Sequence, residues 1–186
     1  MKKTHMYVDQ GWLSIAEAVN SPNSDPRSDE RAVSLLVIHN ISLPPGQFGG
    51  GHINELFSNT LNAEKHPYFA KISNLKVSAH LLIDRHGYVT QFVPFNKIAW
   101  HAGVSTFEGL TNCNEYSIGI ELEGTDNDPY TDIQYACLGK IARLLMSIYP
   151  EITERRIVGH SEIAPDRKTD PGSAFDWSYF KSLLVD

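Results

Sequence analysis

The run Val33-Ser34-Leu35-Leu36-Val37-Ile38-His39 says most about how this chain folds. It is short and almost entirely apolar, which is typical of a strand buried within a sheet. A histidine follows directly after the last aliphatic residue. The strand would therefore carry His39 to its end, where the loops that build functional sites usually gather.

The other segments alternate between strand and helix patterns. Ser117–Leu122 alternates with a period of two, which predicts a second strand. Asp132–Ile148 carries apolar residues at helical spacing, and Pro150 follows its end, which predicts a helix. The remaining expected elements are a hairpin of Val77–Asp84 and Tyr88–Phe95, short helices at Ile53–Leu61 and Asp176–Leu184, and a last strand at Ile157–His160.

Interleaved strands and helices predict an α/β fold, and the hairpin makes the sheet a mixed one. We expect a single domain with a central mixed β-sheet flanked by α-helices. Residues 1–32 are rich in turn formers and predict an extended N-terminal arm packed on the domain, anchored by Trp12 and Leu13. Residues 33–186 would form the domain that carries the functional site.

Composition limits the classes of function. The chain has 186 residues and a net charge of -6, which argues against nucleic acid or an anionic membrane as the main partner. Its two cysteines, Cys113 and Cys137, form no CxxC pattern, so free thiols are the simpler interpretation. We see no secretory signal, membrane anchor or sign of an obligate protein partner, and we expect a cytoplasmic protein.

A second informative run extends from Gly159 to Gly172 and holds His160, Lys168, Asp166 and Asp170 in a loop rich in Pro and Gly. His39, His160 and Asp170 together offer two imidazoles and a carboxylate, the donors of a catalytic zinc site with one position left for water. Taken alone, Asp170 would be interpreted as a turn former before Pro171, and for Asp166 we keep that interpretation.

Two further charged residues could take part in chemistry. Glu121 faces away from the aliphatic residues of its strand, so it either meets solvent or handles a proton over the metal. Glu123 lies on the same face, so position alone does not choose between them. Lys168 is either a solvated loop lysine or a cation that stabilises an oxyanion.

The loop Trp100-His101-Ala102-Gly103 is the last candidate region. Trp100 could stack on a sugar or pack in the core, and packing is the commoner role for tryptophan. His101 could contact substrate or support a metal ligand. His80 lies within an apolar strand, where a hydrogen-bonded core histidine is the expected role.

Five segments follow one another along the chain: Val37-Ile38-His39-Asn40, Val77-Ser78-Ala79-His80, Trp100-His101-Ala102-Gly103, Ile118 to Gly124, and Gly159 to Gly172. In this order, they resemble the zinc N-acetylmuramyl-L-alanine amidases of the amidase-2 class. The resemblance runs from about Gly11 to the last helix and implies a fold like that of the peptidoglycan recognition proteins. It also implies a hydrolase that cuts the amide between the lactyl group of (anhydro-)N-acetylmuramic acid and L-alanine, with muramyl peptides as substrate, in peptidoglycan recycling.

The resemblance also implies roles for single residues. The zinc ligands would be His39, His160 and Asp170, with Glu121 moving the proton and Lys168 assisting at the carbonyl. The muropeptide groove would be lined by Asn40, Lys76, Trp100 and His101. The family pattern has arginine where this chain has Lys76, and lysine cannot make the two-pronged contact to a carboxylate that arginine makes.

Two other interpretations remain at this stage. The first is a non-catalytic muropeptide-binding module of the same fold, for which loss of a metal ligand would be the usual sign. The second is a structural zinc site closed by Cys113 or Cys137. The position of Cys137 on an apolar helix stripe favours core packing instead.

Overall fold

A six-stranded mixed sheet forms the centre of the computed structural model, which describes residues 6–29 and 33–185. Neighbouring strands are parallel except for the antiparallel pair β6 and β7, so the predicted mixed α/β sheet is confirmed. Its strands, in spatial order, are β12 (Ile157–Gly159), β5 (Leu35–Ile41), β11 (Ser117–Glu123), β6 (Leu81–Ile83), β7 (Val89–Gln91) and β3 (Glu17–Ala18).

The two longest strands, β5 and β11, pair in parallel along seven residues each. Leu36, Ile38, Ile118 and Ile120 on these strands are fully buried. Burying one such aliphatic side chain contributes about 1.5–3 kcal/mol. The apolar run Val33–His39 therefore forms a central strand, but the strand begins at Leu35 and continues two residues past His39, which was expected at its end.

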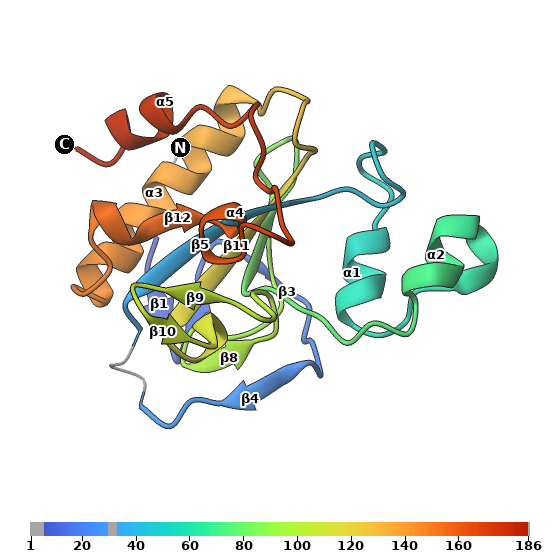
Figure 1. The fold of residues 1–186 in the computed structure, drawn as a ribbon, viewed down its shortest axis with the longest axis horizontal. Helices are drawn as coiled ribbons and strands as arrows, with labels where there is room; N and C mark the ends of the chain where they lie inside the picture. The colour runs from blue at the N-terminus through green and yellow to red at the C-terminus, as the bar shows by residue number, and fades with distance from the viewer. Residues whose placement is uncertain (1–5, 30–32, 186) are drawn as a thin grey trace.

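The long helix α3 (Asp132–Ile148) covers one face of the sheet and has the bounds that the sequence predicts. Thr131 caps its start by accepting a bond from the Gln134 N–H, which satisfies one of the free donors of the first turn. Of the apolar residues at helical spacing in this segment, Ile141 and Leu145 are buried, whereas Ile133 and Ile148 at its two ends are exposed. Leu138 and Ala142 complete the buried face. Figure 1 shows α5 (Trp177–Ser182) beside α3 at the C-terminal end of the chain.

Two short helices, α1 (His52–Phe57) and α2 (Pro67–Ile72), stand apart from α3 on the right of Figure 1. They bury Phe57 and Phe69 in a second apolar cluster that also holds Leu82 and Phe92. The predicted helix over Ile53–Leu61 is shorter than expected because Asn59 takes a left-handed backbone conformation (φ 61°) that ends it. This second cluster forms one wall of the cavity described below.

The N-terminal segment contributes more regular structure than the extended arm that we expected. Its strand β3 completes the edge of the central sheet, and β4 (Ser24–Pro26) pairs with β8 (Lys97–Ala99). A small hairpin joins β1 (Val8–Asp9) to β2 (Trp12–Leu13), where Leu13 is buried as predicted. Residues 1–5 and 30–32 of the arm lie outside the described residues, and the boundary at residue 32 stays a prediction.

Short elements complete the fold. The helix α4 (His160–Ile163) follows β12 directly, and β9 (Thr106–Phe107) pairs with β10 (Leu110–Thr111). Single 3-10 turns span Ala63–Lys65, Cys113–Tyr116 and Glu154–Arg156. Among the described residues, no helix is both long and apolar enough to cross a membrane.

Candidate metal centre and active site

Three side chains that are far apart in the sequence meet at one end of the sheet. Nδ1 of His39 lies 3.0 Å from Nδ1 of His160 and 3.0 Å from Oδ2 of Asp170. Nδ1 of His160 lies 3.1 Å from the same carboxylate oxygen. All three residues are buried, so the three donor atoms face a common point inside the protein and could hold a metal ion.

The sheet and one tight loop create this convergence. His39 lies on β5, and His160 follows the neighbouring parallel strand β12, so both imidazoles reach the same end of the sheet. The chain then turns back, and the Ser161 N–H donates to the carbonyl of Asp170 at 3.0 Å. Gly159 permits this return, because a Cβ atom there would lie 2.8 Å from Cδ of Pro171.

Burial and hydrogen bonding set the charges in the cluster. Burial lowers the pKa of His39 to about 4, so its imidazole is neutral near pH 7 and can offer a lone pair. Burial alone would raise the pKa of Asp170, but its bonds to His160 and His39 outweigh that and hold the pKa well below its usual range. A neutral imidazole beside a carboxylate anion is the donor state that a divalent cation requires.

Glu121 lies directly across from His39, as its partner in the parallel pairing of β5 and β11. It is 8% exposed, and its Oε2 atom is buried without a hydrogen-bond partner among the described residues. Burial first, and then the charge of Asp170, raise the pKa of this carboxyl well above its usual value. A perturbed carboxyl with a free oxygen beside a metal cluster is a candidate for proton transfer.

Glu123, which the sequence could not distinguish from Glu121, has a different role. Its Oε1 atom accepts from the Gly49 N–H at 2.6 Å, and Oε2 accepts from the Arg85 N–H at 3.3 Å. Both oxygens are thus used to hold loops, and Glu123 does not line the cavity.

A cavity of about 580 Å³ opens over the cluster. Its volume falls in the range of sites for small organic ligands, which is larger than a single ion requires. Eight of the nine site residues expected from the sequence line it, namely His39, Asn40, Trp100, His101, Glu121, His160, Lys168 and Asp170. Lys76 is the exception: it is exposed, and its neighbours Leu75 and Val77 line the cavity in its place.

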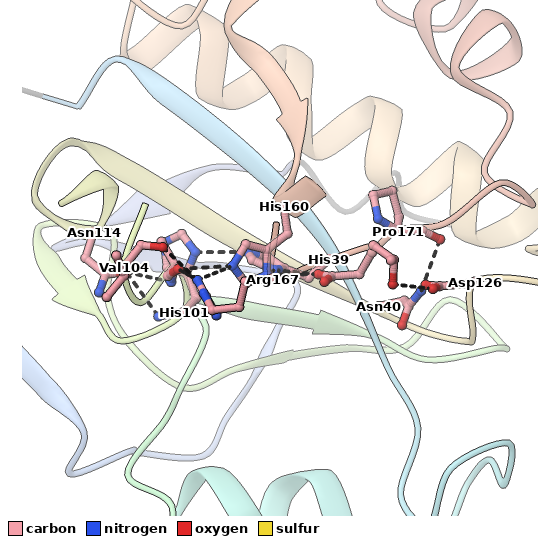
Figure 2. Close-up of polar contacts among 12 residues, drawn as sticks. His39, Asn40, His101, Val104, Asn114, Asp126, His160, Arg167 and Pro171 are labelled. Carbon is pink, nitrogen blue, oxygen red and sulfur yellow. Dashed lines mark hydrogen bonds and ion pairs between the residues drawn. The ribbon is translucent and has the colours of Figure 1, made fainter. Parts of the chain in front are cut away.

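The loop Trp100-His101-Ala102-Gly103 supports both histidines of the cluster. Nε2 of His39 lies 2.9 Å from Nδ1 of His101, and Nε2 of His160 lies 3.0 Å from the carbonyl oxygen of Ala102 (Figure 2). With each Nδ1 facing the cluster, each Nε2 carries the hydrogen and donates it to this loop. The loop therefore holds the orientation of both imidazoles.

His101 fits closely against β11. Its Nε2 atom lies 3.0 Å from the hydroxyl of Ser117, so both ring nitrogens are engaged within the protein. A Cβ atom on Gly119 would lie 2.4 Å from Cγ of His101, so only glycine at that position leaves room for the ring. Burial lowers the pKa of His101 well below its usual value.

Trp100 and Lys168 lie at the cavity with part of their surface exposed. The indole N–H of Trp100 donates to Oδ2 of Asp25 at 2.7 Å, which ties the ring to strand β4 of the N-terminal segment. The positive charge of Lys168 acts on both His39 and Glu121 and favours a lower pKa for each. Lys168 is therefore close enough to influence charge in the site.

The structure adds two polar residues that the sequence argument missed. Arg167 donates from Nη2 to the carbonyl oxygens of Ala102 and Val104 at 2.6 and 2.9 Å, which joins the two loops around the cluster (Figure 2). Asp126 accepts from the side-chain amide of Asn40 at 2.8 Å. Arg167 lies within the Gly159–Gly172 run, but its spacing gave no sign of these contacts, and Asp126 follows the last motif strand without a pattern of its own. Both residues act through contacts with distant segments.

The cysteines take no part in the cluster. Both are free thiols, Cys113 buried and Cys137 partly buried. Sγ of Cys113 lies 3.1 Å from the hydroxyl of Tyr116, and Cys137 packs against the main core. In the described part of the chain, the group of potential metal ligands contains only His39, His160 and Asp170, so a structural zinc site closed by cysteine is wrong.

The α/β fold, with a His-His-Asp cluster that could hold a metal ion at one end of its sheet, is compatible with a hydrolytic enzyme, and comparison with known proteins gives the family. The family model described as N-acetylmuramoyl-L-alanine amidase matches residues 29–173, and the chain belongs to this family. Within the family, the chain is 55% identical to the 1,6-anhydro-N-acetylmuramyl-L-alanine amidase AmpD of Escherichia coli K12, over 96% of this chain and 97% of that protein.

Solved structures agree with this placement. A crystal structure of a selenomethionine AmpD derivative has a TM-score of 0.94 and 54% identity, covering 97% of this chain and 100% of that one. AMPDH3 from Pseudomonas aeruginosa, solved in complex with an anhydromuramic pentapeptide, has a TM-score of 0.63 and 26% identity over 83% of this chain and 60% of that one. The amidase fold predicted from the sequence is therefore confirmed.

Proposed function

We propose that this protein hydrolyses the amide bond between the lactyl group of anhydro-N-acetylmuramic acid and L-alanine in muropeptides. The observation that carries this proposal is the cavity where His39, His160 and Asp170 converge opposite the unpartnered oxygen of Glu121. Membership of the amidase family and the similarity to AmpD support the choice of substrate. Such an enzyme acts in the recycling of cell-wall peptidoglycan.

Zinc is the metal that suits the donor set best. Two imidazole nitrogens and one carboxylate oxygen are ordinary zinc ligands, and three protein ligands are the number found at catalytic sites. The three atoms lie 3.0–3.1 Å apart. Donors bound tetrahedrally at about 2.0 Å would be separated by about 3.3 Å, so the cluster needs little movement. A zinc ion held there would polarise the amide carbonyl and lower the pKa of a nearby water.

Glu121 takes the proton of the attacking water and passes it to the leaving amine nitrogen. Its free Oε2 atom can accept the proton without giving up another hydrogen bond. Because burial raises its pKa, Glu121 is a stronger base than an exposed glutamate, which suits acceptance of the proton of water in the first half of the reaction.

Lys168 supplies positive charge where the amide carbonyl develops an oxyanion. Its charge already acts on His39 and Glu121, which supports this position. Trp100 and Asn40 line the cavity and bind the muropeptide. His101, which the sequence suggested as a substrate contact, instead positions His39, because both of its ring nitrogens are engaged within the protein.

Lys76 is the weakest member of the expected groove. It is exposed beside the cavity, and its role in binding the peptide stem stays a prediction. A lysine there would attract an acidic stem as a point charge, without the two-pronged geometry of arginine.

A non-catalytic muropeptide-binding module remains the alternative function. Two observations disfavour it: the complete His39, His160 and Asp170 cluster, and the buried Glu121. A buried carboxyl oxygen without a partner costs free energy, and a protein that only binds the muropeptide gains nothing from it. The cytoplasmic location also stays a prediction, supported by the two free thiols, since disulfides are rare in that compartment.

Mass spectrometry of an anhydro-muramyl tripeptide incubated with the purified protein tests the proposal. We expect free tripeptide to appear, to stop when a zinc chelator is added, and to return when zinc is restored. Zinc-loaded protein that binds the substrate and releases no peptide would establish the binding module instead.

A further inference from the structure

The carboxylate of Asp126 connects the two segments that carry metal ligands. Its Oδ1 atom accepts from the side-chain amide of Asn40, the residue after His39, at 2.8 Å. Its Oδ2 atom accepts from the hydroxyl of Thr169, the residue before Asp170. One side chain in the loop after β11 thus bonds to the immediate neighbours of two ligands that lie 131 positions apart.

The main chain around Asp126 reinforces this connection. The Ala174 N–H donates to the carbonyl oxygen of Asp126 at 2.9 Å. Gly172 packs so closely that a Cβ atom there would lie 2.1 Å from Cα of Asp126, and its φ of 82° also favours glycine. The loop that holds Asp170 is therefore pressed against Asp126 by its backbone and cannot drift from it freely.

Asn40 adds a contact to the residue that follows Asp170. Its side-chain amide also donates to the carbonyl oxygen of Pro171 at 3.0 Å (Figure 2). The hydroxyl of Tyr130 donates to the same oxygen at 2.7 Å. The residues on either side of Asp170, Thr169 and Pro171, are thus both held by the pair Asn40 and Asp126. Movement of the main chain at Asp170 away from the histidines would break these bonds.

We propose that Asp126 is a positioning residue that presets the distance between His39 and Asp170, and with it the affinity of the metal centre. This inference rests on the proposed function, because it assigns the metal site to those residues. Outer groups that orient metal ligands commonly change metal affinity or activity by about 10–100-fold when removed. Asp126 acts on the main-chain segments that carry the ligands, so we expect an effect at the lower end of that range.

Zinc affinity measured by competition with a chelator of known affinity tests this proposal. We expect D126A and T169V each to weaken zinc binding about tenfold. The double variant should be no weaker than D126A alone, since both changes remove the same bond. T169S keeps the hydroxyl, and D126N keeps an acceptor for Asn40 while its amide can donate to the Thr169 oxygen, so both should stay within about twofold of the wild type.

The matched control is D128A. Asp128 is an exposed acid two residues further along the same loop. Within the described part of the chain, its carboxylate accepts a hydrogen bond only from the hydroxyl of Thr125. We expect D128A to bind zinc like the wild type. The proposal would be overturned if both D126A and T169V bind zinc with wild-type affinity. It would also be overturned if these variants only lower the unfolding midpoint of the metal-free protein and leave zinc affinity unchanged. A wild-type protein that binds no zinc would count against the metal centre itself, and so against the proposed function.

Discussion

His39 and Glu121 are direct partners in the parallel pairing of β5 and β11. Side chains of paired residues point to the same face of a sheet, so the metal-facing imidazole and the proton-handling carboxyl share one face. The opposite face of β11 packs through Ile118, Ile120 and Leu122 into the core with α3. His39 and Glu121 therefore stand on the two buried central strands, whereas Asp170 and Lys168 come from a loop.

Replacement of Glu121 tests its proposed role in proton transfer. Glu121→Gln keeps the shape of the side chain but removes the group that accepts a proton. We expect kcat to fall by about 10²–10⁴, with KM and zinc content nearly unchanged, because general acid–base catalysis contributes about that much. Glu123→Gln is the matched control on the same strand and should retain most activity. Equal activity in the two variants would mean that Glu121 carries no proton.

The third ligand can be tested by metal content. Asp170→Ala removes the carboxylate shared by His39 and His160. We expect the purified variant to hold little zinc and to show no turnover, with its secondary structure retained by circular dichroism. Asp166→Ala, in an exposed part of the same loop, should bind zinc normally. Full zinc content in the Asp170 variant would place the metal elsewhere.

The contact between His101 and His39 gives a separate prediction. His101→Leu leaves the Nε2–H group of His39 buried without an acceptor, which costs about 1–3 kcal/mol. We therefore expect zinc affinity to fall about 10–100-fold. His101→Asn places a carbonyl oxygen near the position of Nδ1 and should recover most of that loss. If the leucine variant binds zinc as tightly as the asparagine variant, the hydrogen bond has no positioning role.

His80 predicts a pH dependence of stability. Burial is the main cause that lowers its pKa to about 3, and its Nδ1 atom accepts from the Gly119 N–H at 3.0 Å. In the unfolded chain a histidine titrates near 6.5. Between these values only the unfolded chain takes up this proton, so stability falls as the pH falls from about 6.5 towards 3.

Unfolding of the metal-free protein in denaturant at several pH values measures this effect. His80→Asn keeps an acceptor for the Gly119 N–H and removes the titrating ring. The variant should lose stability less steeply on acidification, by up to about 1.4 kcal/mol per pH unit. Identical slopes in the variant and the wild type would contradict this, because they would show that His80 has the same pKa in the folded protein as in the unfolded chain.

Local patterns were enough to predict the scaffold. The apolar run ending at His39 and the helical spacing over Asp132–Ile148 both correspond to the observed elements, because burial and period determine such segments locally. The expected strands Val77–Asp84 and Tyr88–Phe95 are shorter, at Leu81–Ile83 and Val89–Gln91, since only part of each run pairs within the sheet.

The supporting contacts could not be predicted in the same way. Asp126 and Asn40 are 86 positions apart, and neither belongs to a pattern that indicates their bond. Nothing in the sequence around Gly119 indicates that the ring of His101 packs against it and requires a glycine there. Such relationships depend on how segments meet in space, so residue types and spacing cannot reveal them.

Hydrolysis in water enriched in ¹⁸O tests the central claim most directly. The purified, zinc-loaded protein would be incubated with anhydro-muramyl tripeptide, and the masses of both products would be measured by mass spectrometry. The account predicts one ¹⁸O atom in the lactyl carboxylate of the sugar product and none in the tripeptide. Label in the peptide, or no cleavage at all, would contradict an amidase that attacks the lactyl carbonyl.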